Sequence, residues 1–262
     1  MRSLLPGAAL LWLVALSQSP GQTVPWPVNG GPDNIRYSPL DQINRTNVAR
    51  LEVAWTYDSR DAFRASEMQS NPIIVDGVLY ATTPTLKVVA IDAGSGREIW
   101  KFDPSGGATT SPRFRHRGVT VHRDRVFVSY RSFLYALARK TGEPISSFGT
   151  KGRIDLREGL DQPAERLSVS ASTPGSIFED MIIMGSSVPE TLPGSPGHIR
   201  AFDVNTGINP VDLPHDPEAG RIRLRDVAEG RPSPVGRRQR VGRRDGRHDT
   251  RDGVRGHGIG LL

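Results

Sequence analysis

The hydrophobic pattern between residues 71 and 103 is a series of short apolar runs separated by turn residues. The pair Asp76-Gly77 divides the first two runs, and such a pair between short runs predicts a tight β-hairpin. Gly94 and Gly96 divide the next two runs, where a turn requires positive φ. The four runs cover residues 73–75, 78–81, 88–92 and 98–100. With no helix between them, they predict one antiparallel sheet, which cannot bury its own faces.

The same pattern returns twice further along the chain. The second copy ends at Gly142, 46 positions after Gly96, and the third ends at Gly207, 65 positions after Gly142. Their apolar runs cover residues 119–121, 125–128 and 133–137, and then 175–177, 181–184 and 198–203. A supersecondary unit repeated at roughly 40 to 50 residues, and lengthened in one copy, predicts a β-propeller or a related array. The alternative is a β-sandwich with several hairpins, which the shared order of strands and terminal glycine disfavours.

An apolar run at the amino terminus predicts export. Arg2 precedes a run that continues to Leu16, and small or polar residues follow it. This pattern predicts a signal peptide over residues 1–21 and a periplasmic or otherwise extracytoplasmic chain with no transmembrane segment after cleavage. A buried first helix is the weaker alternative, because the run has no polar face. The absence of cysteine excludes a disulfide framework and does not argue against export.

The positive charge is concentrated toward the carboxyl end. Residues 208–262 contain 12 arginines, no lysine, 8 acidic residues and no aromatic residue, although the whole chain has a net charge of only +6. Such a segment cannot bury enough apolar surface to offset chain entropy, so it is predicted to be disordered. It is interpreted either as a basic arm that attracts nucleic acid or anionic lipid, or as the product of a frame change. The second interpretation is favoured, and no nucleic-acid partner is expected.

Several short motifs precede the first sheet. They are Trp26, Gly30-Gly31, Arg36-Tyr37-Ser38-Pro39-Leu40, Ile43-Asn44 and Val53-Ala54-Trp55, the last within a predicted strand over Leu51–Tyr57. In this order they resemble the amino-terminal end of quinoprotein dehydrogenases, eight-bladed propellers that bind pyrroloquinoline quinone (PQQ), and are most similar to the glucose dehydrogenase-like branch. The resemblance covers about residues 24–207. It implies an all-β fold in which residues 22–207 form a partial β-propeller of four-stranded antiparallel blades.

The resemblance also implies a PQQ site near the propeller axis. Arg117 matches the arginine of an Asn-Arg-Gly or Cys-Arg-Gly motif that reaches the acidic oxygens of the quinone, and a guanidinium can pair with two oxygens at once. The alternative for Arg117 is a solvated arginine in a charged run. Gln69 matches a polar position that contacts the quinone, and its alternative is a surface amide that caps a strand. The adjacent cysteines of the methanol dehydrogenases are missing.

Hydroxyl-bearing segments supply the remaining implied contacts. Ser172 is the cofactor-binding hydroxyl chosen from a Ser- and Thr-rich segment, ahead of Ser170 and Thr173. The segment 185–190 resembles Gly-Ser-Ser-Gly-Ala-Glu of the methanol-oxidising branch. This match places Ser186 and Ser187 beside the quinone and makes Glu190 a calcium ligand, a role that suits a hard cation. The segment departs from the motif at Val188 and Pro189.

Other candidate residues are interpreted as structural. Trp55 and Trp100 occupy the same point of successive units, and the resemblance implies that such tryptophans dock one blade against the next. His116, His122 and His198 lack metal-ligand spacing and are assigned no chemistry.

The resemblance implies the amino-terminal part of a PQQ-dependent dehydrogenase that oxidises a sugar or alcohol hydroxyl, with hydride transfer to PQQ. A quinone or cytochrome c of the respiratory chain would accept the electrons. The catalytic aspartate of the family would lie beyond residue 207, so no catalytic residue is assigned and little or no activity is expected of this chain. The alternative is a non-catalytic propeller that binds other proteins, which would need neither Arg117 nor Glu190.

Overall fold

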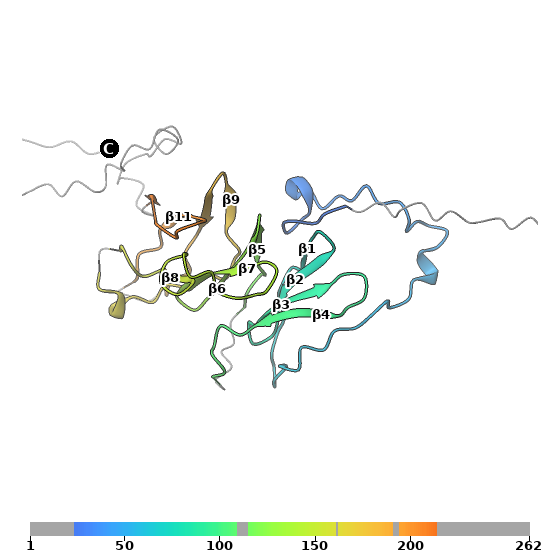
Figure 1. The fold of residues 1–262 in the computed structure, drawn as a ribbon, viewed down its shortest axis with the longest axis horizontal. Coiled ribbons are helices and arrows are strands. Elements are labelled where there is room, and N and C mark those ends of the chain that lie inside the picture. The colour runs from blue at the N-terminus through green and yellow to red at the C-terminus, as the bar shows by residue number, and fades with distance from the viewer. Residues whose placement is uncertain (1–23, 109–114, 161, 191–193, 214–262) are drawn as a thin grey trace, which may run out of the picture. The chain divides into compact units, whose positions relative to one another are not determined.

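The computed structural model describes residues 24–108, 115–160, 162–190 and 194–213, and most of its strands are labelled in Figure 1. Its contacts place these residues in one compact unit, residues 1–217. The second unit, residues 218–262, lies outside the described part, as do the predicted signal peptide and residues 214–217. Among the described residues no helix has the length and apolarity needed to cross a membrane.

All strands of the described residues belong to three four-stranded antiparallel sheets, which confirms the predicted all-β fold built of repeated units. The first sheet has the order β1-β2-β3-β4, with each strand beside its neighbour in sequence. Its strands are β1 (Ile73–Val75), β2 (Val78–Thr82), β3 (Val88–Asp92) and β4 (Glu98–Phe102). The turn at Asp76 and Gly77 joins β1 to β2 and has positive φ at both residues, as an Asp-Gly hairpin requires.

The second and third sheets repeat this meander. The second consists of β5 (Thr120–His122), β6 (Arg125–Tyr130), β7 (Phe133–Ala138) and β8 (Arg153–Asp155). The third consists of β9 (Ser176–Phe178), β10 (Met181–Met184), β11 (Ile199–Asp203) and β12 (Val211–Leu213). Because β12 pairs with β11, the third sheet extends past Gly207, where the sequence placed the end of the propeller segment. Three short 3-10 helices complete the described elements: η1 (Pro32–Asn34), η2 (Val48–Arg50) and η3 (Ala164–Arg166).

The core lies between successive sheets. One cluster joins Tyr80 and Val88 of the first sheet to Val126 and Val128 of β6. A second cluster joins Phe127, the residue between those two valines, to the third sheet through residues that include Ile182 and Phe202. Alternate side chains of a strand point to opposite faces, so β6 contributes to both clusters. The second sheet is therefore covered on both faces, and each junction between sheets buries apolar surface from both partners.

Tryptophan side chains dock one sheet on the next. The indole Nε1 of Trp100, in β4, donates to the carbonyl oxygen of Arg139 at 2.9 Å. The ring packs on Gly142, where a Cβ atom would lie 2.5 Å from Trp100 Cε3. Both contacted residues belong to the turn after β7, so the outer strand of the first sheet docks on the second sheet. The predicted docking role of Trp100 is confirmed.

Trp55 makes the same pair of contacts with the first sheet. Its Nε1 donates to the carbonyl oxygen of Ala93 at 3.0 Å, and a Cβ atom on Gly96 would lie 2.6 Å from Trp55 Cδ2. The strand predicted over Leu51–Tyr57 is nevertheless not observed, because this segment pairs with no strand among the described residues. The segment that carries Trp55 thus contacts the first sheet in the same way as β4, through Trp100, contacts the second sheet.

We expect Gly142→Ala to lower the free energy of unfolding more than Gly77→Ala. Both glycines have positive φ, 75° and 73°, so alanine carries a similar backbone cost of about 1–2 kcal/mol at either position. Only at Gly142 would the new methyl group also collide with Trp100, whereas nothing lies within 4 Å at Gly77. The collision adds about 1–3 kcal/mol. Urea unfolding of the two variants measures the difference, and equal losses would show that the tryptophan contact is unimportant.

Candidate functional site

Three segments lead into the first strands of the three sheets and are hydrogen-bonded to one another. We call residues 67–72, 115–119 and 168–175 the lead-in segments. The amide N–H of Arg117 donates to the carbonyl oxygen of Ser172 at 2.9 Å, and the amide N–H of Asn71 donates to the carbonyl oxygen of Arg117 at 3.1 Å. Arg117 therefore lies in the middle segment and is joined through its backbone to both of the others.

A cavity of about 720 Å³ opens on the lead-in segments, a volume typical of small-molecule sites, which span roughly 300–1,000 Å³. Four of the six cofactor and metal residues implied by the sequence line this cavity: Gln69, Arg117, Ser172 and Ser187. The other principal lining residues are Phe63, Glu67, Arg115 and Ser170. The strand order brings these residues together from positions more than a hundred residues apart in the chain.

The wall that contains Phe63 is held by a partly buried carboxylate. Asp61 accepts hydrogen bonds from the hydroxyl groups of Thr83 and Thr85, in the turn between β2 and β3, and from Ser59. Partial burial raises the pKa of Asp61, but the hydrogen bonds from these donors together lower it by more. The pKa of Asp61 therefore lies below its usual value. The carboxylate is therefore ionised at neutral pH and fixes this segment to the first sheet.

Ser187 reaches the cavity through pairing of the third lead-in segment with the chain that follows β10. The amide N–H of Ser187 donates to the carbonyl oxygen of Ser170 at 2.7 Å, and the reverse bond is 3.0 Å long. This bridge places the hydroxyl-bearing residues Ser172 and Ser187 at one hollow of about 360 Å³, which Ser186 also lines. The hydroxyl of Ser186, however, donates to the carbonyl oxygen of His198 at 2.8 Å and is already engaged.

Glu190 is exposed and lines neither of these two hollows. Among the described residues there is also no group of three or more His, Cys, Asp and Glu side chains that could hold a metal ion. The assignment of Glu190 as a calcium ligand remains a prediction from the sequence.

The cavity contains one cation that is paired and one that is not. Arg115 Nε lies 3.1 Å from Glu67 Oε2, and the amide of Gln69 donates to the same oxygen at 2.9 Å. The guanidinium of Arg117 makes no hydrogen bond or ion pair with any described side chain or backbone group. Arg117 can therefore receive an anionic group with two oxygens in a charge-assisted bidentate contact.

His116, to which the sequence analysis assigned no chemistry, is a buried histidine beside Arg117. Its side chain is only 4% exposed, and burial, the dominant cause, lowers its pKa to about 4. Nδ1 accepts the amide N–H of Gly118 at 3.2 Å, and Nε2 lies 2.8 Å from the hydroxyl oxygen of Ser129 in β6. The spacing of His116 from other histidines indicated no metal site. Alternate side chains of an extended segment point to opposite sides, however, so a histidine between the exposed Arg115 and Arg117 is expected to face inward.

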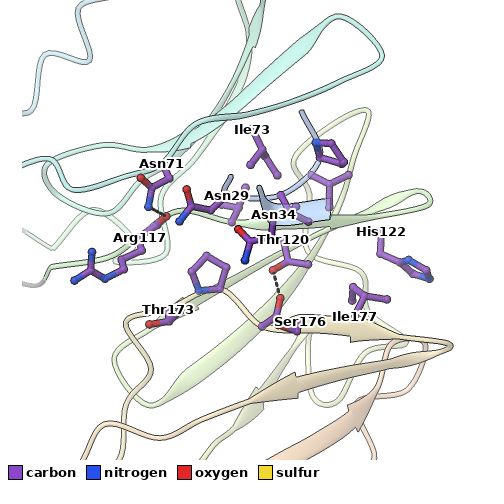
Figure 2. Close-up of a pocket in the computed structure, with 16 residues that line it drawn as sticks. Asn29, Asn34, Asn71, Ile73, Arg117, Thr120, His122, Thr173, Ser176 and Ile177 are labelled. Carbon is purple, nitrogen blue, oxygen red and sulfur yellow. Dashed lines mark hydrogen bonds between the residues drawn. The ribbon is translucent and has the colours of Figure 1, made fainter. Parts of the chain in front are cut away.

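A second cavity, of about 490 Å³, lies beside the first strands of the three sheets (Figure 2). Asn29 and Asn34, from the amino-terminal segment, lie between Ile73 and Thr120 in this view. The hydroxyl of Thr120 donates to the carbonyl oxygen of Gly175 at 2.6 Å and ties β5 to the third lead-in segment. Arg117 borders both cavities and is the residue they share.

Comparison with known proteins gives one consistent family. The family model described as "PQQ: Glucose/ethanol/alcohol dehydrogenase, beta-propeller domain" matches residues 26–210. The dehydrogenase subunit of the alcohol dehydrogenase (quinone) of Gluconobacter oxydans is 34% identical over 177 residues, which cover 66% of this chain and 22% of that protein. The quinoprotein glucose dehydrogenase of Escherichia coli is 30% identical over 216 residues, which cover 72% of this chain and 27% of that protein.

The solved structures agree with the sequences. The quinohemoprotein alcohol dehydrogenase of Comamonas testosteroni matches with a TM-score of 0.58 and 28% identity, over 75% of this chain and 28% of that one. A europium-containing methanol dehydrogenase matches with a TM-score of 0.54 and 22% identity, which shows the fold alone. The chain thus spans about a quarter of the length of the relatives that it matches.

Acidification is expected to destabilise the fold through His116. The imidazole of an unfolded chain takes up a proton near its ordinary pKa of 6.5, whereas burial holds the pKa of the folded state at about 4. The unfolded chain therefore binds the proton first as the pH falls, and the free energy of unfolding drops between these two values by up to about 3 kcal/mol. This contribution is fully present above pH 6.5 and is lost as the pH falls toward 4.

Urea unfolding across this pH range measures the effect. His116→Asn is the matched control, because it removes the titrating group and still presents an acceptor to Gly118. The other ionisable groups titrate in both proteins, so only the difference between the two pH profiles reports on His116. Superimposable profiles would contradict the assignment of a buried neutral histidine.

Proposed function

The chain belongs to the family of PQQ-containing glucose, ethanol and alcohol dehydrogenases, within their β-propeller domain, and on that basis we propose that it binds PQQ in the cavity at the lead-in segments. The bound cofactor would serve the oxidation of a sugar or alcohol hydroxyl. The observation that supports this proposal most directly is the convergence of Gln69, Arg117, Ser172 and Ser187 on one cavity.

The donor set of the cavity fits this cofactor. PQQ is a planar ortho-quinone with several carboxylates, so its site requires positive charge and hydrogen-bond donors around an apolar wall. Arg117 supplies the unengaged cation, Ser172 and Ser187 supply hydroxyl groups, and Phe63 contributes the apolar surface. When bound, PQQ accepts the hydride that leaves the substrate. The described residues bind and orient it, and none of them is assigned as the catalytic base.

The amide of Gln69 is already oriented. Its Nε2 donates to Glu67 at 2.9 Å, which leaves the amide oxygen and one N–H free to contact a ligand. Glu67 in turn is held by Arg115, so the three side chains form a small polar network at the rim of the cavity. A preformed network of this kind lowers the entropy cost of binding.

Calcium is proposed as a second cofactor with Glu190 as one of its ligands. A calcium ion takes six to eight oxygen ligands, so a single carboxylate cannot form the site. The remaining ligands would come from PQQ, from water or from residues outside the described part. This part of the proposal rests on the sequence motif at residues 185–190.

The proposed substrate and electron acceptor follow the names of the relatives, whereas the proposed location follows from the sequence. We propose a sugar or alcohol as substrate, in line with the alcohol and glucose dehydrogenases above. A respiratory quinone or cytochrome c is proposed as the electron acceptor, the quinone being in the name of the Gluconobacter relative. Export to the periplasm through a signal peptide at residues 1–21 is proposed from the sequence alone.

Arg117→Gln is expected to weaken PQQ binding about tenfold or more. A hydrogen bond to a charged group contributes about 1.5–3 kcal/mol, and a bidentate contact would be lost. Arg97→Gln is the control, since it removes the same charge from an exposed position in the turn between β3 and β4. Equilibrium binding of PQQ, followed by titration calorimetry, gives the two dissociation constants.

The outcomes separate the proposed function from the protein-binding scaffold. A wild-type chain that fails to bind PQQ would favour the scaffold. Equal losses of affinity in Arg117→Gln and Arg97→Gln would show that the arginine acts only through net charge, and would place the cofactor elsewhere.

The chain with PQQ, calcium and an artificial electron acceptor is expected to show no turnover of glucose or ethanol. Glu67 is the carboxylate that lines the cavity among the described residues, and its oxygens are engaged by Arg115 and Gln69. It is therefore poorly placed to take the proton of a substrate hydroxyl. Substantial PQQ-dependent reduction of the acceptor would contradict this expectation and would point to Glu67 as a candidate base.

A further inference from the structure

The histidine between the two cavity arginines has a hydrogen-bond pattern that defines its protonation state. The hydroxyl of Ser129 donates to the carbonyl oxygen of Ala171 at 2.8 Å, so its oxygen must accept from His116 Nε2. The amide N–H of Gly118 donates to Nδ1 on the other side of the ring. Only a neutral imidazole with its proton on Nε2 satisfies all three bonds.

This chain of bonds joins three parts of the fold at one point. His116 belongs to the second lead-in segment, Ser129 belongs to β6, and Ala171 belongs to the third lead-in segment. The residue between His116 and Gly118 is Arg117, whose own backbone is bonded to Ser172 and Asn71. Both backbone groups of Arg117 and both of its neighbours in the chain are therefore held.

Gly118 has a conformation that this arrangement requires. Its φ is 116°, in the region that favours glycine, and a Cβ atom would lie 2.9 Å from the carbonyl oxygen of Asn71. The amide N–H of Gly118 points to His116 in this conformation and to no other acceptor within the described part of the chain. Loss of the imidazole acceptor would leave a buried N–H unpaired and favour rotation of the backbone next to Arg117.

We propose that the neutral imidazole of His116 is a positioning group that holds Arg117 at the cavity by accepting the N–H of Gly118. The proposal deepens the proposed function, since it assigns a residue that acts on the cofactor through another residue. The guanidinium of Arg117 is bonded to no described residue, so its place depends on its backbone, which Ser172 and Asn71 hold directly and His116 holds through Gly118.

The surroundings of His116 oppose its protonation. Its charged neighbours along the chain are Arg115, which is paired with Glu67, and Arg117. The groups that β6 and the third lead-in segment present to the ring are the hydroxyl of Ser129 and, beyond it, the carbonyl oxygen of Ala171, and both are uncharged. A proton on Nδ1 would face the N–H of Gly118 and would place a positive charge on a ring that is only 4% exposed.

Two substitutions of His116 test the hydrogen bonds of its two ring nitrogens separately. His116→Asn keeps an oxygen where Nδ1 stands and can still accept from Gly118, whereas His116→Gln extends its amide toward Ser129 and loses that acceptor. We expect the dissociation constant for PQQ to rise about tenfold or more in His116→Gln and to stay within about threefold of wild type in His116→Asn. Titration calorimetry near neutral pH measures both.

Thr120→Val controls for a purely structural effect. It removes the 2.6 Å hydrogen bond between β5 and Gly175 without touching His116, and it should lower stability to urea while leaving the affinity for PQQ unchanged. A loss of affinity in Thr120→Val that matches the loss in His116→Gln would overturn the proposal, because affinity would then follow stability alone. Wild-type affinity in His116→Gln would also overturn it, as would equal losses in His116→Gln and His116→Asn.

A measurement without cofactor separates this proposal from the proposed function. The ¹⁵N NMR signals of His116 should show a proton on Nε2 alone, and the Nε–H signal of Arg117 should shift in His116→Gln but not in His116→Asn. A wild-type chain that binds no PQQ refutes the proposed function. The NMR signals of His116 and Arg117 then still show whether His116 positions Arg117, because they are measured without the cofactor. An Arg117 signal that is identical in all three proteins would overturn the proposal.

Discussion

The whole described structure depends on contact between neighbouring sheets. A four-stranded meander of three- to six-residue strands has two faces and no layer of its own to cover them. The second sheet is covered on both faces because Val126 and Phe127 of β6 point to opposite sides, each into a separate cluster. Stability is therefore a property of the junctions, as in repeat proteins, where each unit contacts mainly its neighbours.

The same junctions create the cavity. The first two lead-in segments are irregular, and each is hydrogen-bonded to the lead-in segment of the next sheet: Asn71 to Arg117, and Arg117 to Ser172. Polar side chains at equivalent points of successive repeats are thereby brought to one place. A site built in this way cannot be supplied by any one sheet, and its geometry is sensitive to residues such as His116 that fix the junction without facing the ligand.

The repeat and the hairpin turns were predictable from the sequence because they are local. Asp76-Gly77 encodes a turn, and Arg117 carries a recognisable motif. Strand β8 was not predicted, since Arg153-Ile154-Asp155 contains a single apolar residue and depends on β7 for its pairing. The strand predicted at Leu51–Tyr57 failed for the opposite reason: its apolar alternation is present, but strand structure also requires a partner. The burial of His116 could not be read from residue spacing, since it depends on contacts with β6 and the third lead-in segment.

The third junction shows what a sheet-to-sheet contact requires. Trp55 and Trp100 each supply a flat apolar surface to a glycine and an N–H to a carbonyl three residues before it. At Gly207 the surface comes from Ile154 and Phe148, and the donor is the amide N–H of Gly149, which bonds the carbonyl oxygen of Thr206 at 2.8 Å. This junction uses the same apolar surface and the same kind of hydrogen bond, but three residues supply them in place of one tryptophan. The spacing of tryptophans could therefore reveal two of these junctions and not the third, whereas the glycine at the end of each repeat marks them all.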